Sequence, residues 1–186
     1  MKGDTGMKCL HTIQNVFRVF QILSKIAMIL SFVAAGLAAA GILCTIAWNS
    51  GGTVAGMDME TWQALTETES LNHMLGVLLS DLVILLADGV LYLFAYRYFK
   101  AEQADGTPFT HHGADRIRRL GIQSIVLPLV AVIIAAVIHR YLDLPQTMEW
   151  SNGSYVMLGI VLILASVVFH YGAELEEQLA NEGESK

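Results

Sequence analysis

Residues 74–96 read MLGVLLSDLVILLADGVLYLFAY, a predominantly apolar run of the length that crosses a bilayer. The run contains two carboxylates, Asp81 and Asp88. Seven helical residues advance about 10 Å and nearly two turns, so both side chains leave the helix on one face. An aspartate surrounded by hydrocarbon is costly. The run therefore predicts a membrane helix whose acidic face points into protein or water.

Three further runs have the same character and are long enough to span a membrane: 26–48, 120–142 and 155–172. A hydrophobic content of 54% with a mean hydropathy of +0.52 exceeds what an ordinary water-soluble domain carries. Lipid offers no hydrogen bonds to the backbone, and none of the runs alternates apolar with polar residues. The sequence therefore predicts an all-α protein, a single integral membrane domain over 1–186 built as a four-helix bundle.

Basic residues fall almost entirely on one side of the predicted spans. Those before the first span and between the second and third are Lys2, Lys8, Arg18, Lys25, Arg97, Lys100, Arg116, Arg118 and Arg119. The other two connections contribute only Arg140. By the positive-inside rule, we expect both termini, the connection 97–119 and the tail 173–186 to face the cytoplasm. The net charge of −6 arises from acids in the first outer loop and the tail, so it reflects topology and does not indicate a partner.

Residues 11–25 place apolar side chains at spacings of three and four among polar ones. Two interpretations stay open for this stretch. It either forms a helix along the inner headgroups that turns into the first span, or extends that span into the cytoplasm.

Small residues four positions apart allow two helices to approach closely. Such pairs occur in the first three spans: Gly36 with Ala40, Gly76 with Ser80, and Ala131 with Ala135. The first pair has small neighbours, which predicts that the first helix lies at the centre of the bundle. Pro128 removes one backbone donor within the third span and favours a kink there.

The connection 97–119 and the tail offer groups for a cytoplasmic partner. The stretch Gly-Thr-Pro at 106–108 is a turn signal, and Thr110 is suited to cap a helix that begins before the membrane. The predicted partner surface consists of Pro108, Phe109, Arg116, Arg118, Arg119, Glu174, Leu175 and Leu179. Anionic lipid also attracts arginines at this depth. Since topology alone explains so short a basic patch, direct nucleic-acid binding is not expected.

Two stretches resemble a known family. One is Pro108-Phe109-Thr110 followed by Arg116, Arg118, Arg119, Leu120 and Gly121, and the other is VFHYGAEL at 168–175. They are similar to the bacterial membrane protein family catalogued as domain of unknown function 2975. The resemblance implies a four-helix bacterial membrane protein, often encoded beside a small helix-turn-helix regulator. It supplies no catalytic residue, and Asp81 and Asp88 lie outside the matching stretches.

Two interpretations of the aspartates follow. In the first, Asp81 and Asp88 are neutral and each bonds to a neighbouring helix, with Ser124 near the depth of Asp88 and His139 near that of Asp81. In the second, they form a protonatable or cation-binding site. The four residues Asp81, Asp88, Ser124 and His139 are the predicted intramembrane polar site.

Catalytic and cofactor motifs are missing from the sequence. There is no phosphate-binding glycine loop, nucleophile elbow or zinc-protease helix, so we expect no enzyme. His73 and His139 have similar depth, but histidine at a membrane boundary more often meets headgroups or water than haem, and no cofactor or metal is predicted. The leading hypothesis is a non-catalytic sensory or partner-binding component of the bacterial plasma membrane, associated with a cytoplasmic regulator. The alternative is a small proton- or cation-coupled transporter or channel subunit that uses Asp81 and Asp88, and this version requires a homo-oligomer.

Overall fold

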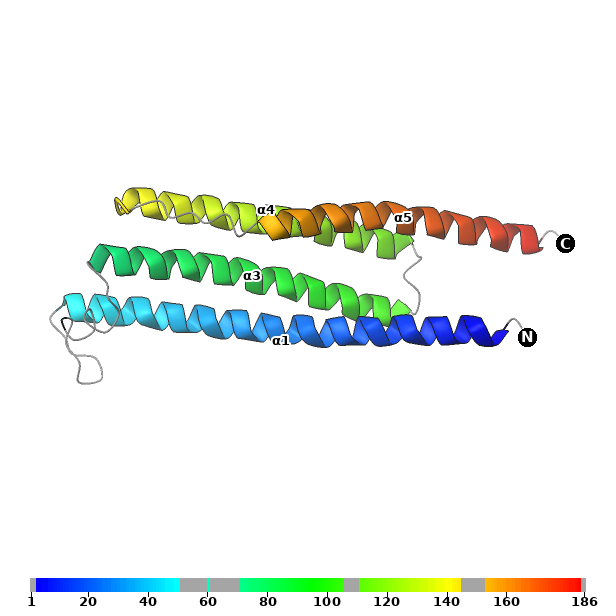
Figure 1. The fold of residues 1–186 in the computed structure, drawn as a ribbon, viewed down its shortest axis with the longest axis horizontal. Helices are drawn as coiled ribbons and strands as arrows, with labels where there is room; N and C mark the ends of the chain where they lie inside the picture. The colour runs from blue at the N-terminus through cyan, green and yellow to red at the C-terminus, as the bar shows by residue number, and fades with distance from the viewer. Residues whose placement is uncertain (1–2, 51–59, 61–70, 106–110, 145–152, 185–186) are drawn as a thin grey trace. The chain divides into compact units, whose positions relative to one another are not determined.

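The computed structural model describes residues 3–50, 60, 71–105, 111–144 and 153–184; the side chains of 3–14, 105, 111, 153–154, 176 and 179–184 lie outside the description. Within these ranges the chain forms four long helices and no strand (Figure 1): α1 (Gly3–Asn49), α3 (Leu71–Asp105), α4 (His111–Tyr141) and α5 (Gly153–Glu184). The predicted all-α class with four helices is confirmed.

Each helix contains a stretch long and apolar enough to cross a membrane: Asn15–Asn49, Leu71–Ala104, His112–Tyr141 and Tyr155–Leu175. These stretches include the predicted spans apart from Leu142, which lies just past the end of α4. The protein is therefore a multi-pass membrane protein. The helices continue past the spans because the flanking sequence holds few breakers. No glycine or proline occurs from Arg97 until Gly106, and α3 accordingly runs on to Asp105.

The first span and the stretch that precedes it form one continuous helix. α1 is 47 residues long and passes through residues 11–25 without a break. Of the two interpretations of that stretch, the straight extension is the one the structure shows. α4 likewise begins at His111, well before its apolar part, and runs through Pro128 to Tyr141.

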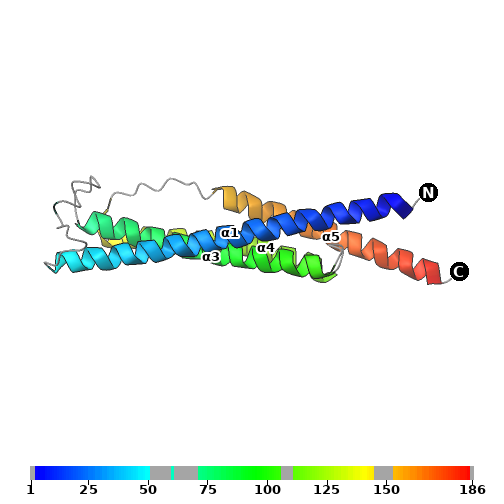
Figure 2. The same cartoon turned by 90° about the horizontal axis from the view of Figure 1, so that it is seen from below.

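The chain divides into two compact units: residues 1–28, 90–127 and 151–186 form unit 1, and residues 29–89 and 128–150 form unit 2. Unit 1 contains parts of all four helices. Its core consists of Leu91, Tyr98, Ile117 and Leu120, against which side chains of α5 such as Leu162 and Phe169 pack. The start of α1 and the end of α5 both belong to this unit and point the same way (Figure 2).

The backbones of α4 and α5 approach closely in unit 1 at two glycines. A Cβ atom on Gly121 would lie 2.9 Å from the carbonyl oxygen of Gly159, and one on Gly159 would lie 2.8 Å from that of Gly121. Real Cβ atoms do not come so near to backbone. The crossing of α4 and α5 therefore requires glycine at both positions.

Unit 2 contains parts of only three of the described helices, because all of α5 belongs to unit 1. α3 contacts α1 where Leu78 meets Gly41 and where Phe32 meets Gly89, and Gly76 lies against Leu144 in the turn after α4. The predicted small-residue pairs of α3 and α4 are buried, with Ser80 at 6%, Ala131 at 4% and Ala135 at 5% exposure.

Within one chain, the prediction that another helix approaches closely at Gly36 and Ala40 is wrong. A Cβ atom added to Gly36 would meet nothing within 4 Å, and Ala40 is exposed. Of the small neighbours that the prediction included, Ala35 is buried, and Ala38 is buried as well. Small residues surround Gly36 on every side of the helix, so composition shows that close approach is permitted but does not show which face is used.

Candidate functional site

Glu102 is fully buried near the C-terminal end of α3. Its side chain has 0% exposure, although the sequence places it in a connection expected to face water. Tyr98, one turn earlier on the same face, is also buried, at 6% exposure. In the first turns of α4, Gly113 and Ala114 are buried as well.

An arginine on α4 faces this carboxylate. Nη1 of Arg116 lies 3.8 Å from Oε1 of Glu102, and the Arg116 side chain is 40% exposed. Removing a carboxylate from water costs several kcal/mol, which a nearby guanidinium offsets in part. A pair with one buried and one partly exposed member adds little net stability, but it disfavours arrangements of α3 and α4 that separate the two charges. The pair therefore favours the observed placement of the start of α4 on the end of α3.

Aromatic rings join α1 to the same end of α3. The ring of Phe99 stacks on that of Phe20 with centroids 5.4 Å apart, and it lies 6.2 Å from that of Phe17. Tyr98 meets Phe99 edge to face at 5.2 Å. Such pairs add about 0.5–1.5 kcal/mol each beyond area burial. Three helices of unit 1 are thus held together around the Glu102 and Arg116 pair.

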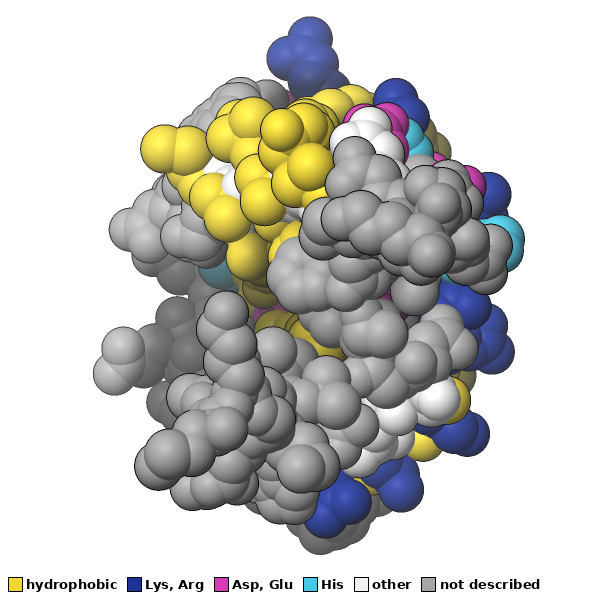
Figure 3. Space-filling model, turned by 90° about the vertical axis from the view of Figure 1, so that its right-hand side faces the viewer, with side chains coloured by type: hydrophobic (Ala, Val, Ile, Leu, Met, Phe, Trp, Pro, Cys, Tyr) yellow, Lys and Arg dark blue, Asp and Glu magenta, His cyan; other side chains and the backbone are white. Residues whose placement is uncertain are grey.

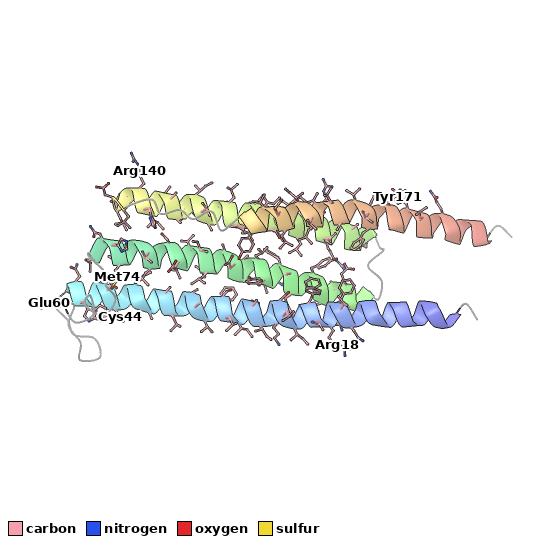
Figure 4. All side chains as sticks on the ribbon, in the orientation of Figure 1. Arg18, Cys44, Glu60, Met74, Arg140 and Tyr171 are labelled. Carbon is pink, nitrogen blue, oxygen red and sulfur yellow. The ribbon has the colours of Figure 1, made fainter. Side chains whose placement is uncertain are left out.

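Unit 1 also carries exposed cations on α1, α3 and α4. They are Arg18, Lys25, Arg97, Lys100, Arg118 and Arg119. Arg18 projects away from α1 (Figure 4), and the space-filling view shows lysine and arginine side chains reaching the surface (Figure 3). Of the three arginines predicted to bind a partner, Arg118 and Arg119 are exposed and Arg116 is partly committed to Glu102.

The other predicted partner residues divide into described and undescribed positions. Glu174 and Leu175 are exposed on α5, and Oε1 of Glu174 lies 3.7 Å from Nε2 of His170 one turn earlier. Pro108 and Phe109 lie outside the described residues, as does the side chain of Leu179. The part of the predicted surface that is described therefore belongs entirely to unit 1.

The two intramembrane aspartates differ in their surroundings. Both belong to unit 2, where Asp88 is half-buried and Asp81 is exposed on the surface of the chain. The exposure of Asp81 shows that its side chain is not covered by its own chain, and the prediction that the acidic face meets protein or water stays a prediction. An aspartate at hydrocarbon depth costs about 2.5–3.5 kcal/mol on insertion scales at the helix centre. Because one chain leaves Asp81 uncovered, the transporter alternative requires a second chain and stays a prediction.

The predicted hydroxyl and imidazole partners of the aspartates belong to different units. Ser124 is buried in unit 1, and its hydroxyl donates to the carbonyl of Leu120 at 2.9 Å. A serine has a single O–H, so this proton is not available to a carboxylate. His139 shares unit 2 with Asp81 and Asp88 and is half-buried. Among the described residues, no group of three or more His, Cys, Asp or Glu side chains is placed to hold a metal ion.

Glu102 is the residue of this site that sequence reasoning missed. Its signal was an acid close to the C-terminal end of a helix, where the helix dipole disfavours negative charge. A second signal was its i, i+4 spacing from Tyr98. These signals indicate that Glu102 has a special environment, but they do not reveal that Arg116 supplies it. Comparisons of the chain with protein-family models, curated proteins and solved structures give no match. The resemblance to the family of unknown function 2975 stays a prediction.

Proposed function

We propose that this chain is a non-catalytic component of the bacterial plasma membrane whose cytoplasmic face holds a protein regulator. The observation that carries the proposal is the junction of α3 and α4 in unit 1. The buried Glu102 faces Arg116 at the start of α4, and the same turns present Arg118 and Arg119 to solvent. Two adjacent exposed arginines are suited to recognising carboxylates on a partner.

The C-terminal end of α5 supplies a second, chemically different contact in the same unit. Glu174 is acidic and Leu175 is apolar, and both are exposed. A partner that meets both segments would need acidic groups for the arginines and basic or apolar groups for α5. This mixture is typical of a protein surface and not of a nucleic acid. The family resemblance points to the kind of partner, a small helix-turn-helix regulator encoded beside the gene.

Binding of that adjacent regulator to the protein in lipid nanodiscs tests the proposal. We expect Arg118→Glu with Arg119→Glu to weaken binding at least tenfold, because both exposed guanidinium groups change sign. Truncation after Ala173, which removes the acidic end of α5, is expected to do the same. Lys25→Glu is the matched control, since Lys25 is an exposed cation of unit 1 outside the proposed surface. Unchanged binding by both variants, or equal loss in the control, would contradict the proposal, and membrane fractionation checks that each variant inserts.

A further inference from the structure

Asp81 occupies the side of α3 that neither α1 nor α4 covers in unit 2. At about 100° per residue, Leu78 and Gly89, which contact α1, lie about 60–80° to one side of Asp81. Gly76, which contacts Leu144 in the turn after α4, lies about 140° to the other side. α1 therefore contacts α3 on one side of Asp81 and the turn after α4 contacts it on the other, and Asp81 is exposed between these contacts.

The open side of α3 continues beyond this one residue. Val77, one turn before Asp81, is 38% exposed, and Asp88, two turns after it, is half-buried on the same side. Met74 also has this orientation but is buried at 8% exposure, so the uncovered stripe begins at Val77. The uncovered stripe therefore consists of the exposed Val77 and Asp81, with Asp88 partly covered farther along the same side.

Lipid acyl chains offer no hydrogen bond to the carboxyl group of Asp81 in this stripe. Asp81 lies seven residues inside the apolar run that begins at Met74, or about 10 Å along the helix, well within the hydrocarbon layer. Acyl chains neither donate nor accept hydrogen bonds, so a carboxyl group at this depth is stable only against another polar group. Asp81, which is exposed in one chain, therefore requires a polar group from outside the chain.

We propose that a second copy of this chain covers the stripe, with Asp81 of one copy facing Asp81 of the other. Two copies inserted in the same direction are related by an axis along the membrane normal, which places identical residues at identical depth. A carboxylic acid is its own complement, because the protonated group donates and the ionised or neutral group accepts. The second copy therefore places its own Asp81 carboxyl group at the depth of the first. An unrelated helix would need a separate polar residue at that depth. This interface does not depend on the proposed cytoplasmic partner.

Cysteine cross-linking of the full chain in native membranes tests the interface. In a background with Cys9 and Cys44 replaced by Ser, Val77→Cys places a thiol beside an intact Asp81. We expect mild oxidation to convert most of this variant to a covalent dimer. Leu43→Cys is the matched control, because Leu43 is 69% exposed on α1 near the depth of Val77, and it should yield at least tenfold less dimer.

Substitutions at position 81 in the Val77→Cys background test whether the carboxyl group of Asp81 is needed for the cross-link. Asp81→Asn retains a donor and an acceptor and should keep the cross-link, whereas Asp81→Ala should reduce it at least tenfold. Equal cross-linking of Val77→Cys and Leu43→Cys would overturn the inference, as would a cross-link from position 77 to a different protein. If Asp81→Ala fails to insert, the comparison of Val77→Cys with Leu43→Cys still tests whether the second copy covers the stripe.

Discussion

At the scale of single residues, two acids show how environment decides the role of a side chain. Glu102 lies in a segment that reads as a solvated connection, yet its side chain is inaccessible and faces Arg116. Asp81 lies in a segment that reads as membrane core, yet it is exposed in one chain. Both residues are acids, and neither residue type nor the hydropathy of the segment shows which of the two is buried. The direction in which each side chain points is what separates the two roles.

The Glu102 and Arg116 pair predicts an unequal response to losing each partner. Arg116→Met removes the guanidinium from a fully buried carboxylate, and we expect it to lower the free energy of unfolding by about 2 kcal/mol. The value lies below that of a fully buried pair because Arg116 is partly exposed. Glu102→Gln should cost less, since the arginine left behind reaches water. Unfolding in mixed micelles with a denaturing detergent, followed by circular dichroism, measures both.

The double variant Glu102→Gln with Arg116→Met controls for lost packing. It should recover more than half of the stability lost in Arg116→Met, because no buried charge remains. Arg118→Met, an exposed change on the same helix, should stay within about 0.5 kcal/mol of the unchanged protein. The electrostatic account fails if the double variant is no more stable than Arg116→Met alone.

At the scale of helices, glycines show which contacts the fold uses. Gly121 and Gly159 allow the backbones of α4 and α5 to meet, whereas a Cβ atom on Gly36 of α1 would have nothing within 4 Å. All three glycines lie in apolar helical sequence. Only the first two have a structural reason to be glycine in a single chain, because a methyl group at either would collide with the carbonyl of the other helix.

Alanine at the crossing predicts a position-specific loss of stability. We expect Gly159→Ala to lower the free energy of unfolding by about 1–3 kcal/mol, the usual cost of overpacking. Gly36→Ala is the matched control and should have no destabilising effect, since its added methyl group meets open space. The same detergent titration measures both variants. A Gly159→Ala protein as stable as the control would mean that α4 and α5 do not cross at these residues.

At the scale of the whole molecule, the distribution of charge predicts the orientation in the membrane. Exposed arginines and lysines cluster in unit 1, which also contains the start of α1 and the end of α5. Anionic lipid and the positive-inside rule both favour placing this unit on the cytoplasmic side. Ser50, just after α1, should then face outward, and Ala104, near the end of α3, should face inward.

Single cysteines in the background without Cys9 and Cys44 test this orientation. A membrane-impermeant maleimide should label Ser50→Cys in intact cells, and it should label Ala104→Cys only after the membrane is permeabilised. Both positions are exposed in the structure, so accessibility within the protein does not limit either reaction. Labelling in the opposite order would reverse the proposed topology and move the arginines to the outer face.

Hydropathy and residue spacing were enough to predict the four helices, their ability to span a membrane and the burial of two small-residue pairs, Gly76 with Ser80 and Ala131 with Ala135. These features are local, because a backbone in lipid must bond to itself and a helix repeats every 3.6 residues. Contacts between helices were needed to reveal that Glu102 is buried against Arg116, that Gly121 meets Gly159 and that Gly36 and Asp81 are uncovered. Helical periodicity states which residues share a face, but which helix meets that face depends on contacts between segments far apart in the chain.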